Sequence, residues 1–309
     1  MTVVHAPAAH HVLQVADLDR EQFAALLDLA AAMKRHPLAW RDALKGRSVA
    51  CYFVKPSTRT RVSFAAAINR LGGLPIMLRP DELRLGRGEP IADTAQAISS
   101  YCEAIVVRTF AQRDVRVLAE NSSVPVINAL TDDHHPCQAL ADCLTLREHF
   151  GSLEGLTLAY VGDGNNVVHS LIEAAALTGM QLRLATPAGC LPDPSILARA
   201  GRAVRILDTP DKAVAGAHAV YTDVWISMGK EAGGADHKTQ LEGYRVTPEL
   251  MALACGDAVF LHCLPAHRGE EVARAVIDGP ASLVFTQAAN RLPTEQALLS
   301  ALVTGNWEV

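Results

Sequence analysis

Hydroxyl and cationic side chains are concentrated in KPSTRTR, residues 55–61. This stretch follows the apolar run VACYFV and precedes VSFAAAINRL, whose apolar spacing predicts a helix. The N-terminus of such a helix favours an anion, because its backbone N–H groups are unpaired and its dipole is positive there. Arg59 and Arg61 are two residues apart, so only one of them can face a ligand. The stretch predicts a phosphate site, with an ordinary capped helix as the alternative.

Two histidines and a cysteine occur together in HHPCQ, residues 134–138. Adjacent histidines seldom converge on one metal ion, and the chain has no second ligand cluster at suitable spacing. Pro136 is typical of the first turn of a helix, which places His135 at the helix mouth and Gln138 one turn later. We therefore expect a site for a small polar group here, with a simple helix N-cap as the alternative.

Three further polar clusters are GDGNN (162–166), DVWISMG (223–229) and HCLPAHRGEE (262–271). The first is an incomplete nucleotide fingerprint, but the amides of Asn165 and Asn166 suit a zwitterion. Asp223 with the hydroxyl and backbone N–H groups of its loop suits an amino acid. Cys263 is either an inert core thiol or, among basic groups, a thiolate.

The elements that must position these clusters alternate between helix and strand. The spacing predicts a helix over 18–35, followed by strands at 48–54, 74–78, 104–109, 124–130, 156–162, 181–186, 203–207, 219–225, 258–264 and 282–285. This alternation indicates an α/β fold of mainly parallel sheets flanked by helices. Most of the polar clusters follow a strand, where ligands bind in open α/β sheets.

The length of 309 residues predicts two domains, with the boundary near HFGSLEG at 149–155. We expect residues 1–148, with a C-terminal helix over 292–309, to form the first domain and residues 149–291 the second. The stretch GKEAGGADHKTQLEG (229–243) is rich in glycine and polar residues, so it predicts a mobile loop.

Composition excludes several classes of protein. A net charge of −5 argues against general attraction to nucleic acid. The sequence contains no long apolar stretch without charged residues, so we expect no membrane span. The N-terminal residues lack the pattern of a signal peptide. The seven cysteines include no C-x-x-C pair, which favours reduced thiols in a cytoplasmic protein over disulfides or a zinc site.

Taken in order, STRTR, HPCQ, GDGNN, DVWISMG and HCLPAHRGEE resemble the motifs of the aspartate/ornithine carbamoyltransferase family. SMG and HCLP are similar to those of the members that act on ornithine. The resemblance covers nearly the whole chain. It implies an N-terminal domain for carbamoyl phosphate, a C-terminal domain for L-ornithine, and a last helix that returns to the first domain.

The resemblance also implies a set of site residues. Those for carbamoyl phosphate are Ser57, Thr58, Arg59, Thr60, Arg84, Arg108, His135, Gln138, Cys263, Leu264 and Arg291. Those for ornithine are Asn166, Asp223, Ser227 and Met228, and the catalytic residues are Cys263, Asp223, Arg108 and His135. A cis peptide is implied between Leu264 and Pro265.

The implied reaction transfers the carbamoyl group to the δ-amine of ornithine and yields citrulline and phosphate. An alkylamine with a pKa of about 10.4 must first lose a proton, a step assigned to Asp223 and Cys263. Donors such as Arg59 and Arg108 stabilise the developing charge. No metal or organic cofactor is implied. Arg84 and Lys230 depart from the residues common in the family: Arg84 either adds a phosphate contact or reads another amine substrate.

Alternatives remain open at this point. One is a carbamoyltransferase for putrescine or an acylated ornithine, and another is a binding homologue without catalysis. GDGNN leaves a nucleotide-binding dehydrogenase as a third, although its fingerprint is incomplete. The resemblance further implies a cytoplasmic homotrimer in arginine biosynthesis, with no nucleic-acid or membrane partner.

Overall fold

The computed structural model describes residues 10–79, 88–226 and 234–309. The chain divides into two compact units. The first contains the described parts of Met1–Leu18, Asp28–Pro136 and Leu292–Val309, and the second contains Asp19–Leu27 and Cys137–Arg291. Across the described residues, the helices are too short or too polar to cross a membrane.

The described residues of the first unit form a four-stranded parallel sheet in the order β2-β1-β3-β4. Its strands are β1 (Ser48–Phe53), β2 (Leu74–Leu78), β3 (Ala104–Arg108) and β4 (Val126–Leu130). The inner strands β1 and β3 are almost entirely buried, as expected for apolar runs covered on both faces. The chain order reverses between β1 and β3, and ligands bind beyond the carboxyl ends of strands at such a point.

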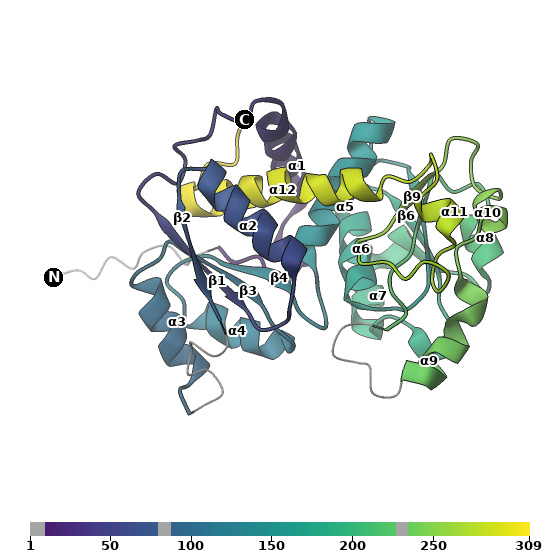
Figure 1. Ribbon diagram of the computed structural model, residues 1–309, viewed down its shortest axis with the longest axis horizontal. Coiled ribbons are helices and arrows are strands. Elements are labelled where there is room, and N and C mark those ends of the chain that lie inside the picture. The colour runs from purple at the N-terminus through teal and green to yellow at the C-terminus, as the bar shows by residue number, and fades with distance from the viewer. Residues whose placement is uncertain (1–9, 80–87, 227–233) are drawn as a thin grey trace. The chain divides into compact units, whose positions relative to one another are not determined.

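Helices cover both faces of this sheet. Figure 1 shows α2 (Thr58–Arg70) over one face and α3 (Ile91–Ser99) and α4 (Gln112–Glu120) over the other. From β1 the chain moves along the sheet to β2 in one direction, and then to β3 and β4 in the opposite direction. Because the crossovers are right-handed, the helices of the two directions lie on opposite faces of the sheet. A short 3₁₀ turn, η1 (Val15–Asp17), precedes the sheet in the chain.

The second unit has a five-stranded parallel sheet among its described residues, in the order β7-β6-β5-β8-β9. Its strands are β5 (Thr157–Val161), β6 (Gln181–Ala185), β7 (Val204–Ile206), β8 (Ala219–Tyr221) and β9 (Val259–Leu261). The reversal of chain order lies between β5 and β8. The loops after these two strands are GDGNN and the start of DVWISMG, so both lie at the expected ligand-binding edge.

The helices of the second unit again lie on both faces of the sheet (Figure 1). The described ones are α6 (Asn166–Thr178), α7 (Pro194–Ala200), α8 (Pro210–Val214), α9 (Gly234–Leu241), α10 (Pro248–Met251) and α11 (Arg274–Ile277). Short 3₁₀ turns are η2 (Ala188–Cys190), η3 (Gly201–Ala203) and η4 (Glu242–Tyr244). Helix α6 ends at Gly179, whose φ of +77° is the left-handed conformation that glycine adopts without strain.

Three helices continue from one unit into the other: α1 (Arg20–Arg35), α5 (Pro136–Phe150) and α12 (Val284–Thr304). The C-terminal part of α12 belongs to the first unit, where Arg47 Nη1 donates to the carbonyl of Val303 across 3.2 Å. The predicted fold of two parallel-sheet domains with a returning C-terminal helix is therefore confirmed.

Two local predictions were wrong. The strand expected at 282–285 is a single bridge between Phe260 and Ser282, because the chain enters α12 at Val284. The loop expected at 229–243 contains the helix α9 (Gly234–Leu241) in its described part. Short apolar runs and glycine-rich composition do not distinguish these cases without the tertiary contacts.

Candidate active site

In the first unit, the sequence STRTR forms the first turn of α2. Ser57 is the N-cap, and its Oγ accepts a hydrogen bond of 3.2 Å from the backbone N–H of Thr60. Thr58 and Arg59 are exposed on this turn, whereas Thr60 is buried. Exposed backbone N–H groups, hydroxyls and a guanidinium at a helix N-terminus can hold a phosphate.

Arg108 lies beside this turn because β3, which it ends, pairs directly with β1. Its side chain is only 4% exposed, and Nη1 donates to Thr60 Oγ1 across 3.4 Å. A buried guanidinium is strongly attracted to an anion, since little water screens its charge. Thr60 and Arg108 thus link two neighbouring strand ends at the point where the chain order reverses.

The other two cations of KPSTRTR have separate roles. Lys55 is buried, forms an ion pair with Asp132, and lies 4.7 Å from the centroid of the Phe110 ring. Arg61 is half-buried, and its charge acts on Cys51, where burial raises the thiol pKa and Arg61 partly opposes that rise. Arg59 is therefore the cation of this stretch that is exposed at the helix mouth.

The turn before His135 is fixed by hydrogen bonds. The Thr131 N–H donates to the His134 carbonyl at 2.9 Å, and the His134 N–H donates to Thr131 Oγ1 at 3.1 Å. Thr131 Oγ1 in turn donates to Gln112 Oε1 at 2.5 Å. His135 follows, 5% exposed, directly before Pro136 at the start of α5. This turn follows β4, the neighbour of β3, so His135 lies on the loop side of the same sheet edge.

In the second unit, the carboxylate of Asp223 is held from three sides. Oδ2 accepts from Asn165 Nδ2 at 2.7 Å, while Oδ1 accepts from the Val224 N–H at 2.8 Å and from Cys263 Sγ at 2.9 Å. These residues follow β5, β8 and β9, which are adjacent in the sheet. The result is an oriented carboxylate, largely buried, that suits a cationic amine.

Asn165 has a second function in this loop. Its Oδ1 caps α6 by accepting from the N–H groups of Val167 and Val168 at 3.0 and 3.3 Å. One amide therefore fixes the helix and orients Asp223 at the same time. Asn166, the predicted ornithine contact, is buried as the first residue of α6.

The loop after β9 is held by His262. The Leu264 N–H donates to His262 Nδ1 at 2.9 Å, so Nε2 carries the ring proton and faces Glu271 Oε1 at 3.2 Å. Burial alone would raise the pKa of Glu271, but hydrogen bonds from His262 and two backbone N–H groups bring it below its usual value. Leu264 has φ of +57°, and the Leu264–Pro265 peptide is cis, as the resemblance implied.

A buried polar network surrounds Asp142 in the second unit. Asp142 Oδ1 accepts from Gln138 Nε2 at 2.8 Å and from Gln287 Nε2 at 2.6 Å, and Arg291 Nη1 donates to Gln138 Oε1 at 3.0 Å. Burial raises the pKa of Asp142 to about 7 against these hydrogen bonds and the charge of Arg291. The predicted residues Gln138 and Arg291 are thus joined through their side chains.

Residues that support the site through buried hydrogen bonds, such as Asp142 and Gln287, were not predicted from the sequence. Gln138 and Asp142 are four residues apart on one helix, and this spacing could have predicted their contact. Gln287 lies 145 residues from Asp142, so the sequence contains no local pattern that predicts that contact. Arg84, Ser227, Met228 and Lys230 lie outside the described residues.

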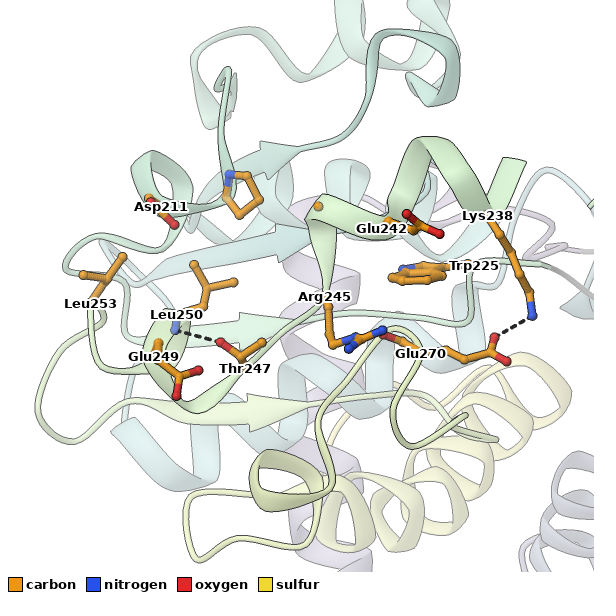
Figure 2. Close-up of a pocket in the computed structure, with 12 residues that line it drawn as sticks. Asp211, Trp225, Lys238, Glu242, Arg245, Thr247, Glu249, Leu250, Leu253 and Glu270 are labelled. Carbon is orange, nitrogen blue, oxygen red and sulfur yellow. Dashed lines mark hydrogen bonds and ion pairs between the residues drawn. The ribbon is translucent and has the colours of Figure 1, made fainter. Parts of the chain in front are cut away.

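A separate pocket of about 880 Å³ lies in the second unit. Figure 2 shows Lys238 and Glu242 above Trp225, with the ion pair of 2.8 Å between Lys238 and Glu270 on one side. Of the predicted site residues that the structure describes, none lines this pocket. It is therefore distinct from the strand-end site around Asp223.

The two units match two domain models of one family. Residues 10–148 match the carbamoyl-P binding domain of aspartate/ornithine carbamoyltransferases, and residues 154–302 match the Asp/Orn binding domain. The chain belongs to the aspartate/ornithine carbamoyltransferase family. Its membership explains why the polar clusters occur in this order along the chain.

Individual members of this carbamoyltransferase family are similar over nearly their full length. The ornithine carbamoyltransferase of Acidothermus cellulolyticus is 51% identical over 95% of this chain and 96% of its own length. That of Symbiobacterium thermophilum is 50% identical over 93% and 96%, respectively. The solved ornithine carbamoyltransferase structure from Pyrococcus furiosus has a TM-score of 0.91 at 43% identity, covering 98% of this chain and 99% of that one. The structure from Thermus thermophilus has a TM-score of 0.88 at 43% identity, with coverage of 97% and 100%.

Proposed function

We propose that this chain is an ornithine carbamoyltransferase, which transfers the carbamoyl group of carbamoyl phosphate to the δ-amine of L-ornithine. The observation that carries the proposal is the carboxylate of Asp223, held by Asn165 and Cys263 within the Asp/Orn binding domain. An oriented carboxylate favours a substrate with an additional ammonium group, as ornithine has, over one with an additional carboxylate, as aspartate has. The ornithine carbamoyltransferases that resemble the chain support the same choice.

The donor is proposed to bind in the first domain, over residues 1–148 and 292–309. Its phosphate would contact the α2 turn through Ser57, Thr58, Arg59 and Thr60, and also Arg108. Its carbamoyl group would contact His135, Gln138, Cys263, Leu264 and Arg291. The exposed Arg59 and the buried Arg108 support this assignment, because they offer both a solvent-accessible and a desolvated cation.

The acceptor is proposed to bind over residues 149–291, with Asn166, Asp223, Ser227 and Met228. The proton of the δ-ammonium group would pass to Asp223, either directly or through the Cys263 thiol, which would give its own proton to Asp223. The free amine attacks the carbamoyl carbon, a C–N bond forms, and the C–O bond to phosphate breaks. Arg108 and His135 would stabilise the charge on the carbamoyl oxygen and on the departing phosphate.

We further propose that the enzyme is a cytoplasmic homotrimer of arginine biosynthesis and that Arg84 reaches the phosphate of a neighbouring subunit. Sedimentation analysis tests the assembly. The role of Arg84 is tested by mixing subunits of the Arg84→Ala variant with subunits of the Arg59→Ala variant. In a mixed trimer, a site on the first variant keeps its own Arg59 and receives Arg84 from the second, so part of the activity should return. No recovery of activity contradicts the proposed role of Arg84.

The function is tested by citrulline formation from carbamoyl phosphate with ornithine, putrescine, acetylornithine and aspartate as acceptors. We expect ornithine to give the highest kcat/KM. A preference for another amine contradicts the assignment of the substrate. Intact carbamoyl phosphate binding without turnover of any acceptor indicates a binding homologue instead.

A further inference from the structure

Asp163, Cys190 and His237 form a cluster outside the proposed substrate contacts. Each offers one metal-ligand atom, and these atoms lie within 4.8 Å of one another. Cys190 Sγ is 3.7 Å from His237 Nδ1, and His237 Nε2 is 3.2 Å from Asp163 Oδ1. Zinc bonds of about 2.0–2.3 Å in tetrahedral geometry place neighbouring ligand atoms about 3.3–3.8 Å apart. The distance from each His237 nitrogen to its neighbouring ligand atom is close to this range.

The backbone holds two members of the cluster together. The Gly164 N–H donates to the Cys190 carbonyl across 2.8 Å, which fixes the turn that carries Asp163 against η2. A Cβ at Gly164 would lie 2.3 Å from the same carbonyl oxygen, so this close approach requires glycine. The Asp163 carbonyl also accepts from the Tyr160 hydroxyl at 2.9 Å. Asp163 and Cys190 are therefore adjacent before any ion binds.

Helix α9 presents the third member. Leu241 packs with Cys190 and Trp225, and His237 lies one turn earlier on the same face of the helix. Lys238 instead lines the pocket of Figure 2 and is tied to Glu270. Packing on one side and an ion pair on the other fix the rotation of α9, which directs His237 towards Cys190.

The chemistry of the cluster favours a metal ion over a nucleophilic cysteine. Cysteine sulfur, histidine nitrogen and carboxylate oxygen are all ligands that bind Zn²⁺ in proteins. A thiolate and a carboxylate are both negatively charged, and a divalent cation between them neutralises these charges. The His237 and Asp163 side chains are 33% and 16% exposed, which leaves a path for an ion and a water ligand.

Two other groups of this kind occur among the described residues, and both are weaker candidates. Asp223, His262 and Cys263 also lie within 4.8 Å, but the His262 nitrogens are engaged by Leu264 and Glu271. In the third group, His267–Glu270–Glu271, Glu270 is paired with Lys238 and Glu271 with His262. The two ring nitrogens of His237 instead face Cys190 and Asp163, the other members of its own cluster, and one of these nitrogens can bind the ion.

From this geometry we infer that Asp163, Cys190 and His237 bind a divalent transition-metal ion such as Zn²⁺, with water as the fourth ligand. The ion joins the β5–α6 turn, η2 and α9 of the second unit. This site goes beyond the proposed carbamoyl transfer, and its occupancy is measured without any assay of turnover.

The test is a titration of the chelator-treated full-length protein with Co²⁺, followed by the thiolate-to-cobalt charge-transfer absorption. We expect a band that saturates at one ion per chain and is removed by Zn²⁺, which binds such sites more tightly. Cys190→Ser should abolish the band. Asp163→Asn and His237→Gln should weaken Co²⁺ binding by at least about 10-fold, with unchanged circular dichroism.

Two further thiol variants serve as controls. Cys263→Ser removes the thiol of the competing Asp223 group, and Cys255→Ser removes a partly exposed thiol elsewhere in the unit. Both should keep the band. Its loss in Cys263→Ser, its survival in Cys190→Ser, or unchanged affinity in a folded His237→Gln protein overturns the inference, as does the absence of a band in the wild type.

Discussion

The thiol of Cys263 donates a hydrogen bond of 2.9 Å to Oδ1 of Asp223, although the two residues are 40 positions apart. They follow the neighbouring parallel strands β9 and β8, so their side chains meet at one edge of the sheet. The carboxylate is therefore a shared acceptor for the thiol, the Asn165 amide and the Val224 N–H. Four predictions test this site, its counterpart in the first unit and the network around Asp142.

Asp223→Asn should weaken ornithine binding by about 10- to 100-fold, because the variant lacks the charge that pairs with the substrate ammonium. Carbamoyl phosphate binding should stay as in the wild type. Isothermal titration with each substrate separates the two effects. Asp211→Asn, at an exposed carboxylate of the same unit, is the matched control and should leave ornithine binding intact. An equal loss for both substrates contradicts the role proposed for Asp223.

Asn165→Ser separates the cap of α6 from the orientation of Asp223. Serine caps helices about as well as asparagine, so thermal stability should change little. Its short hydroxyl does not replace the amide that donates to Asp223 across 2.7 Å. We expect kcat/KM for ornithine to fall by about 5- to 100-fold, as when a buried acceptor loses its donor. A full loss of the folded state, or wild-type kinetics, would count against this second function of Asn165.

Arg59→Ala should lower kcat/KM for carbamoyl phosphate by about 10²–10³, as for the removal of one charge-stabilising donor. Binding of the donor should no longer be detectable by calorimetry. The control is Arg70→Ala, which removes an exposed arginine from the other end of the same helix, where the dipole disfavours an anion. Similar kinetics in both variants would show that general surface charge, rather than the α2 turn, attracts the phosphate.

Asp142 should make stability depend on pH. Its pKa is about 7 in the folded protein, because burial disfavours the charged form, and about 3.9 in an unfolded chain. Between these values the unfolded chain loses the proton and the folded protein keeps it, so this component of stability falls as pH rises. Relative to Asp142→Asn, the wild-type free energy of unfolding should decline by up to about 4 kcal/mol from about pH 4 to 7. Urea denaturation at each pH measures the free energy of unfolding of both proteins. If the difference between the wild type and Asp142→Asn does not vary with pH, the raised pKa of Asp142 is contradicted.

Much of the fold could be predicted because it depends on local patterns. Apolar runs such as 48–54 and 104–109 became the buried strands β1 and β3, and polar clusters followed strands as parallel sheets require. The same local reasoning failed at 282–285 and in α9. There, a run of apolar residues and a glycine-rich stretch were each compatible with either conformation.

The amino-acid sequence by itself determined which polar side chains cluster and at which strand ends they lie. It did not determine their partners. The bond from Asn165 to Asp223 spans 58 residues, and that from Gln287 to Asp142 spans 145. Only the tertiary structure decided such pairs, as it did the neutralisation of Lys55 by Asp132 and the meeting of Asp163, Cys190 and His237. The physical reason is that sheet order and helix packing, which bring distant segments together, depend on burial summed over the whole chain.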